Sequence, residues 1–141
     1  MRFVDTSFWV AYRFRRDDHH AEAVAVWADR SQPLLTTDLV VGETWTFLRR
    51  RVGHTEAVGF LDNVEQSSRL SVRHLDAATA ESALAWLRRH DERDYSFVDA
   101  TSFEVMRRER IAGALAFDGD FAAAGFVELR PAPGADRRRK R

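Results

Sequence analysis

Short apolar runs alternate with longer amphipathic segments along this chain, and this alternation limits its possible folds more than any other feature. The apolar runs predict strands at residues 1–5, 33–37, 70–75, 111–117 and 126–131. Hydrophobic residues at helical spacing predict helices at residues 6–14, 19–30, 38–51, 55–68, 76–90, 96–110 and 121–125. Strands separated by helices pair in parallel, and helices cover both faces of a parallel sheet. The sequence therefore predicts an α/β fold with a central parallel sheet.

The chain of 141 residues is long enough for one domain with its own core, and it contains no internal repeat or linker. We expect residues 1–131 to form that domain. Residues 132–141 lack large apolar side chains and end in "RRRKR", so we expect a disordered basic tail there. Such a tail either contacts nucleic-acid phosphates or only keeps the chain soluble.

The charges of the chain balance in total but are unevenly placed. Basic and acidic side chains number 22 each, yet five of the basic ones lie at residues 137–141, so residues 1–136 carry a formal charge of −5. Proteins that bind nucleic acid usually present a basic body instead. If this chain acts on nucleic acid, a cation would have to stand between its carboxylates and the phosphates.

Cysteine is absent from the sequence, which excludes disulfides, thiolate metal sites and cysteine nucleophiles. No apolar run approaches the ~20 residues of a membrane span. Asp5 also interrupts any signal-like segment at the N-terminus. We therefore expect a cytoplasmic protein that does not contact membranes.

Several acidic residues occupy places where an unpaired carboxylate is costly. Asp5 and Asp118 directly follow apolar runs, so they stand at the carboxyl ends of expected strands, where open parallel sheets bind ligands. Asp120 follows two residues after Asp118. Glu43 shares a helical stripe with Phe47, and Asp99 shares one with Phe103, so both stripes should face the core or a cleft.

Each of these acids also has a purely structural interpretation. Asp5 and Asp120 could cap the helices that follow them. Asp99 completes the S-x-x-D pattern of a capping box, and the "DG" after the fourth strand is an ordinary turn signal. Glu43 could be a partly exposed helix acid. Taken together, however, clustered carboxylates repel one another unless a cation relieves them, and oxygen ligands favour Mg²⁺ or Mn²⁺.

Four short motifs occur in a suggestive order: "VDTS" at 4–7, "GET" at 42–44, "SFVDA" at 96–100 and "FDGDF" at 117–121. In order and spacing they resemble the PIN-domain proteins, specifically the VapC-type ribonuclease toxins of toxin–antitoxin pairs. The resemblance covers nearly the whole chain, from "FVDTS" to "FVELRP". It implies a three-layer α/β/α sandwich and an acidic site that binds Mg²⁺ or Mn²⁺ and cleaves RNA.

The resemblance also assigns roles to individual residues. The matching catalytic acids are Asp5, Glu43, Asp99 and Asp118, with Asp120 as a frequent additional acid and Thr6 or Ser7 as the hydroxyl beside the first acid. The implied metal ligands are Asp5, Asp99 and Asp118, of which Asp5 and Asp99 are favoured for direct contact. Glu43 and Asp118 could instead act through water, hold a second ion or orient the attacking water.

The implied partners are an RNA substrate, a cognate antitoxin and a second copy of the chain. We interpret His19 and His20, a tandem pair beside two aspartates, as solvated surface residues.

The main alternative to a ribonuclease is a catalytically inactive PIN-like module that only binds RNA or protein. A phosphotransferase with an aspartate nucleophile would place its D-x-D motif after the first strand. This chain has "DTS" there, which argues against that class of enzyme.

Overall fold

A five-stranded, all-parallel sheet with the strand order β3-β2-β1-β4-β5 forms the centre of the computed structural model, which describes residues 1–131. The strands are β1 (Arg2–Val4), β2 (Leu34–Thr37), β3 (Leu70–Arg73), β4 (Gly113–Leu115) and β5 (Val127–Glu128). The helices are α1 (Thr6–Arg13), α2 (His20–Ala28), α3 (Asp38–Arg51), α4 (His54–Gln66), α5 (Ala77–Arg89), α6 (Phe97–Glu109) and α7 (Asp120–Ala123).

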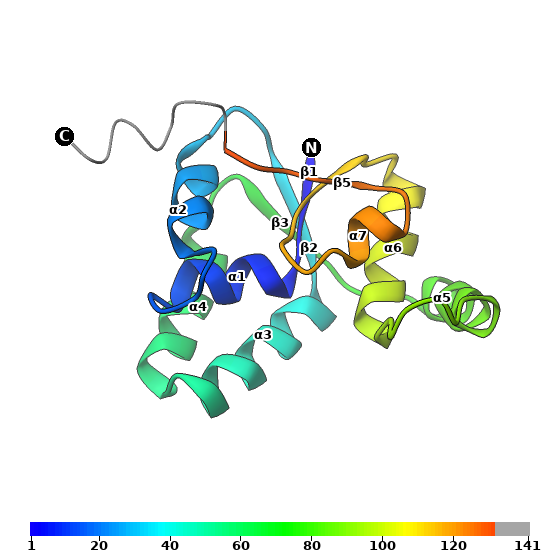
Figure 1. Ribbon diagram of the computed structural model, residues 1–141, viewed down its shortest axis with the longest axis horizontal. Helices are drawn as coiled ribbons and strands as arrows, with labels where there is room; N and C mark the ends of the chain where they lie inside the picture. The colour runs from blue at the N-terminus through cyan, green and yellow to red at the C-terminus, as the bar shows by residue number, and fades with distance from the viewer. Residues whose placement is uncertain (132–141) are drawn as a thin grey trace.

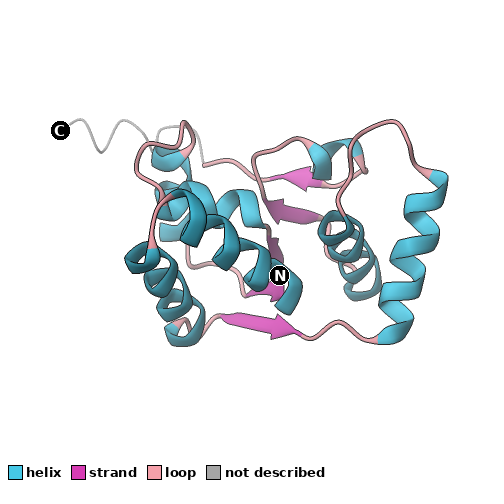
Figure 2. Ribbon diagram, turned by 90° about the horizontal axis from the view of Figure 1, so that it is seen from below, coloured by secondary structure: helices cyan, strands magenta, loops and turns pink. Residues whose placement is uncertain are grey.

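The helices form two groups on opposite sides of the sheet, as Figure 2 shows. Helices α1 to α4 pack together, and α5 packs on α6, which also touches α7 (Figure 1). The three-layer α/β/α sandwich is therefore confirmed. Every strand lies within its expected segment but is shorter than it, most clearly at β4 and β5, because only part of each apolar run pairs with a neighbouring strand.

Side chains at the helix starts explain why the helices begin where they do. Four helices begin with a side chain that accepts a hydrogen bond from a backbone N–H in the first turn. These side chains are Asp5 for α1, Thr37 for α3, Asp76 for α5 and Ser96 for α6. Gly53 separates α3 from α4 with a φ of 135°, a backbone conformation that side chains other than glycine's disfavour. These local signals are visible in the sequence, which is why the element order could be predicted.

Aromatic residues fill the core on both faces of the sheet. Trp9 packs edge-on against Phe60 in the α1–α4 group, with ring centroids 5.2 Å apart. Phe103 packs edge-on against Phe121 on the other side at 4.9 Å, and Phe121 also lies against Phe3 of β1. All five side chains are fully buried. Phe3 thereby joins β1 to the aromatic packing between α6 and α7.

The order of the strands decides where a site can form. The chain moves outward from β1 through β2 to β3 and then returns to place β4 on the other side of β1. The reversal point between β1 and β4 is where open α/β sheets bind ligands. Since β1 and β4 pair in parallel, the residues that follow them, Asp5 and Asp118, come out at the same edge.

The predicted basic tail, residues 132–141, lies outside the described residues. The division of the chain at residue 131 therefore stays a prediction. Within residues 1–131, none of the helices combines the length and the apolar character that crossing a bilayer requires.

Candidate active site

The four acids matched to the PIN-domain motifs converge on one cavity. Asp5, Glu43, Asp99 and Asp118 all line a cavity of about 320 Å³ at the carboxyl ends of β1 and β4. They come from four separate segments: the start of α1, the middle of α3, the first turn of α6 and the loop before α7. Packing of these segments thus brings together residues that lie far apart in the sequence.

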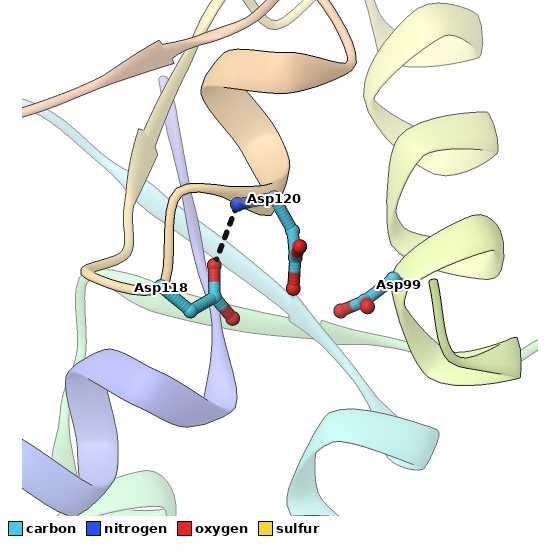
Figure 3. A group of neighbouring side chains, drawn as sticks. All are labelled: Asp99, Asp118 and Asp120. Carbon is cyan, nitrogen blue, oxygen red and sulfur yellow. Dashed lines mark hydrogen bonds between the residues drawn. The ribbon is translucent and has the colours of Figure 1, made fainter. Parts of the chain in front are cut away.

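Asp99, Asp118 and Asp120 form the tightest part of this group. Each offers one carboxylate oxygen, and these oxygens all lie within 4.8 Å of one another. Figure 3 shows the carboxyl groups pointing toward one another, Asp99 from α6 and the other two from the β4–α7 segment. The backbone N–H of Asp120 donates to Asp118 Oδ1 at 3.1 Å, which fixes the turn between them. The oxygens are close enough together to contact a single cation.

Asp120 does not cap α7, contrary to the structural interpretation of the sequence. The N-cap position belongs to Gly119, which has a φ of 82° and provides no side-chain hydrogen bond. Glu128 takes over this role: its carboxylate accepts hydrogen bonds from the N–H groups of Gly119 and Ala122, at 3.2 and 3.0 Å. The Asp120 side chain therefore remains available to the acidic cluster.

Asp5 is the most deeply buried acid of the site, at 2% exposure. Its Oδ2 accepts hydrogen bonds from the Ser7 backbone at 3.1 Å and from Ser7 Oγ at 2.7 Å. Burial, with a further contribution from repulsion by Asp118, raises the pKa of Asp5 to about 8, although the Ser7 hydrogen bonds act in the opposite direction. This carboxylate needs a proton or a cation at neutral pH.

The two hydroxyls beside Asp5 have different surroundings. Ser7 Oγ donates to Asp5 and accepts from the Phe117 backbone N–H at 3.0 Å, so it joins the end of β1 to the segment after β4. Thr6 Oγ1 is buried and lacks a hydrogen-bond partner among residues 1–131, although Thr6 lines the cavity. Of the two alternatives, Ser7 is the hydroxyl that orients the first acid.

Asp99 has a structural and an electrostatic role at once. It forms the predicted capping box, accepting from the Ser96 N–H at 3.0 Å while its own N–H donates to Ser96 Oγ at 2.9 Å. Burial raises the pKa of Asp99, and repulsion from Asp120 and Glu43 adds to this, against the Ser96 hydrogen bonds. The capping box therefore does not keep Asp99 out of the acidic cluster. It holds the Asp99 carboxylate in place within the cluster.

Asp118 stands at the exposed rim of the cavity, yet its carboxylate is partly desolvated by the groups around it. This desolvation raises the pKa of Asp118 to about 6, and repulsion from Asp120 and Asp99 contributes to the rise. The pKa values of Asp5, Asp99 and Asp118 are all raised, because burial and mutual repulsion disfavour their charged forms. Such a group of perturbed acids is typical of a functional site.

Glu43 faces the cavity, but the predicted stripe around it was partly wrong. Phe47 is 38% exposed and also lines the cavity, whereas the buried stripe of α3 consists of Val40, Thr44 and Leu48. Glu43 is half-buried and makes neither a hydrogen bond nor an ion pair within the described part of the chain. It therefore stands at a cleft edge rather than over the core.

Three contributors to the site were missed in the sequence. Arg93 Nε donates to Asp120 Oδ1 at 3.0 Å, and Glu128 anchors the loop that carries Asp118. His19 is solvent-exposed as expected, with 42% of its side chain accessible, but it also lines the cavity. Glu128 could have been noticed as an acid within an apolar strand, but Arg93 and His19 lie in polar loops that give no such signal.

The raised pKa of Asp5 predicts how pH affects the metal-free protein. An aspartate titrates near 3.8 when unfolded, so between about pH 4 and pH 8 the folded state holds a proton that the unfolded state has lost. We expect the free energy of unfolding in EDTA to fall as pH rises through this window, by up to about 1.4 kcal/mol per pH unit. Urea unfolding at pH 5 and pH 8 measures this.

Asp5→Asn is the matched control, because asparagine keeps an acceptor for Ser7 but carries no charge. We expect its stability to vary much less between pH 5 and pH 8 than that of the wild type. Mn²⁺ should stabilise the wild type more at pH 8, since it competes with protons for the same carboxylates. Equal pH dependence in both proteins would contradict the assignment of the buried charge to Asp5.

Comparison with known proteins agrees with this geometry. The PIN domain family model matches residues 2–127. The "23S rRNA-specific endonuclease VapC20" of Mycobacterium tuberculosis, from strains CDC 1551 / Oshkosh and ATCC 25618 / H37Rv, is 53% identical over 131 residues, covering 93% of this chain and 99% of that protein. A crystal structure of Mycobacterium tuberculosis VapC20, described as a sarcin-ricin loop cleaving toxin, matches with a TM-score of 0.88 and 52% identity, over 93% of this chain and all of that one. The chain therefore belongs to the PIN domain family and, within it, to the VapC-type proteins.

Proposed function

We propose that this protein is a metal-dependent endoribonuclease, the toxin of a toxin–antitoxin pair, and that it cuts 23S rRNA in the sarcin-ricin loop. The observation that carries the proposal is the convergence of Asp5, Glu43, Asp99 and Asp118 on one cavity. The relative that is 53% identical over 93% of the chain is a 23S rRNA-specific endonuclease, which supports the choice of substrate. An enzyme that acts on ribosomal RNA works in the cytoplasm, and the proposal places this protein there.

The donor set fits a hard divalent cation. The candidate ligands offer only oxygen atoms, and those of Asp99, Asp118 and Asp120 lie within 4.8 Å of one another. Mg²⁺ and Mn²⁺ prefer such ligands, and either ion would stabilise the charged carboxylates, whose pKa values burial and mutual repulsion raise. We propose Asp5, Asp99 and Asp118 as the residues that hold the ion, with Asp120 as a further ligand.

The protein's own groups supply the rest of the mechanism. A bound ion lowers the pKa of a water molecule and offsets the charge of the phosphodiester. Ser7 keeps the Asp5 carboxylate in one orientation through two hydrogen bonds. Glu43 makes no competing contact among the described residues, so we propose that it accepts the proton of the attacking water. Arg93 balances the charge of Asp120 at the open side of the site.

A protein partner is supported by apolar surface next to the acidic cavity. A groove of about 630 Å³ lies between α3 and the start of α6, and the side chains of Phe47 and Phe97 are exposed in it. Glu43 and Phe47 line both the groove and the acidic cavity, so an occupant of the groove can also block the site. We assign the groove to the cognate antitoxin, and we propose that the protein also forms a homodimer.

Mapping the cut in ribosomal RNA tests the function. Purified toxin, free of antitoxin, should cut the 23S rRNA of isolated ribosomes once, within the sarcin-ricin loop, in the presence of Mg²⁺. Primer extension locates the new 5′ end, and a synthetic hairpin of the loop shows whether the loop alone is sufficient. If folded, metal-loaded protein leaves the 23S rRNA intact, the result would favour the alternative, an inactive PIN-like module that only binds RNA or protein.

A further inference from the structure

His19 and Phe117 form an aromatic pair on one wall of the acidic cavity. Their rings are parallel to within 3°, and the ring centroids lie 4.6 Å apart. Both residues line the cavity together with Asp5, Asp99 and Asp118. The two rings come from segments about a hundred positions apart, the α1–α2 connection and the residue directly before Asp118. The aromatic pair is therefore part of the same site as the acids.

Hydrogen bonds hold His19 in this position from two sides. Its backbone N–H donates to Asp17 Oδ1 at 2.8 Å, which fixes the turn before α2. Its Nδ1 lies 3.3 Å from Glu22 Oε1, and because a carboxylate only accepts, Nδ1 carries the hydrogen in this contact. Nε2 has no protein partner within residues 1–131 and is free to contact a ligand.

Phe117 is held just as firmly and is linked directly to the acidic cluster. Its backbone N–H donates to Ser7 Oγ, which itself donates to Asp5. The Arg130 guanidinium lies 4.8 Å from the Phe117 ring, and Arg130 also donates to the Ala116 carbonyl. The His19–Phe117 pair therefore has a fixed position relative to the carboxylates.

The imidazole of His19 remains accessible although it is stacked. Its side chain is 42% exposed, and Phe117 is the only ring among the described residues that packs against it. A partly exposed, rigidly held aromatic ring beside a phosphodiester-cleaving site is the kind of surface on which proteins stack unpaired nucleobases. Such stacking costs little conformational entropy here, because the ring is already in place.

We infer that His19, supported by Phe117, stacks on a nucleobase of the RNA next to the bond that is cut. His19 is then a substrate-contacting residue that helps select an unpaired nucleotide at the cleavage position. The inference rests on the proposed function, because it assigns a part of the RNA substrate to the aromatic wall beside the carboxylates. It differs from a proton-transfer role, in which the ring nitrogen rather than the ring face would matter.

Two substitutions at position 19 separate these roles. His19→Ala removes the ring, and we expect KM for a synthetic sarcin-ricin hairpin to rise about tenfold, with kcat within about threefold of the wild type. His19→Phe keeps a flat ring without nitrogen atoms, and it should keep KM within about threefold of the wild type. His74→Ala is the matched control, since His74 is 84% exposed and does not line the cavity.

A binding experiment keeps the inference testable apart from catalysis. With Ca²⁺ in place of Mg²⁺, which should permit RNA binding with little cleavage, hairpins with 2-aminopurine at each nucleotide of the loop in turn report stacking through fluorescence quenching. We expect quenching at one position next to the mapped cut in the wild type and in His19→Phe, and its loss in His19→Ala.

The outcomes are distinguishable. Absent cleavage by the wild type overturns the proposed function, whereas unchanged KM and quenching in His19→Ala overturn only the stacking. A loss of kcat in both variants with unchanged KM would assign proton transfer to His19 and overturn the stacking as well.

Discussion

Asp99→Asn should reduce RNA cleavage by roughly 100- to 1,000-fold while leaving the fold intact. The effect on cleavage is large because the substitution removes a charge from the cluster in which Asp99, Asp118 and Asp120 meet, and one lost stabilising group costs about 10²–10³ in rate. The fold should survive because the asparagine oxygen can still accept the Ser96 N–H and keep the capping box. Single-turnover cleavage and urea unfolding measure the two effects separately.

Asp76→Asn is the matched control for this substitution. Asp76 caps α5 by accepting from the Thr79 N–H at 2.7 Å, and it does not line the acidic cavity. Its pKa is lowered by the hydrogen bond from Thr79, the opposite of the direction found at Asp99. We expect full cleavage activity in Asp76→Asn. A comparable loss in both variants would mean that Asp99 matters only as a cap.

Removal of divalent metal should have an effect at least as large. EDTA should abolish cleavage, and Mg²⁺ or Mn²⁺ should restore it, because the ion supplies several kcal/mol of transition-state stabilisation, or about 1,000-fold or more in rate. The structural reason is the cluster of carboxylates, which would repel the RNA phosphates. Burial, with repulsion from Asp118, already raises the pKa of Asp5 to about 8, so its charged form is disfavoured without a cation. Cleavage rates after dialysis against EDTA and stepwise addition of metal give the result.

Ca²⁺ provides the control for the metal experiment. It binds oxygen ligands too, but at longer distances and with more variable geometry than Mg²⁺. We expect Ca²⁺ to permit RNA binding and to support cleavage poorly. Full cleavage in EDTA, with trace metal excluded by elemental analysis, would contradict the proposed mechanism and leave the carboxylates to act without an ion.

The structural and functional interpretations of the acids proved compatible. Asp5 caps α1 and Asp99 completes the capping box of α6, as their local motifs predict, and both also line the acidic cavity. A carboxylate has two oxygens, so one can cap a helix while the side chain still reaches a cluster. The sequence could show the caps and the motif order, but the meeting of the acids depends on the sheet order, which local patterns do not encode.

Other features could not be predicted because tertiary packing decides them. Phe47 follows the helical spacing of a core residue, yet neighbouring elements cover the stripe of Thr44 and Leu48 instead. Glu128 caps α7 from β5, nine positions beyond Gly119, where no local motif would place a cap. His19 belongs to the cavity only because the α1–α2 connection folds back onto Phe117.

Calorimetric titration of Mn²⁺ into the antitoxin-free protein shows whether the acids form a metal site without depending on the RNA substrate. We expect saturable binding by the wild type at neutral pH, a strong loss of affinity in Asp99→Asn and wild-type affinity in Asp76→Asn. Absent binding by folded wild-type protein would contradict this expectation. The acids would then be only caps and turns, and the chain an inactive binding module.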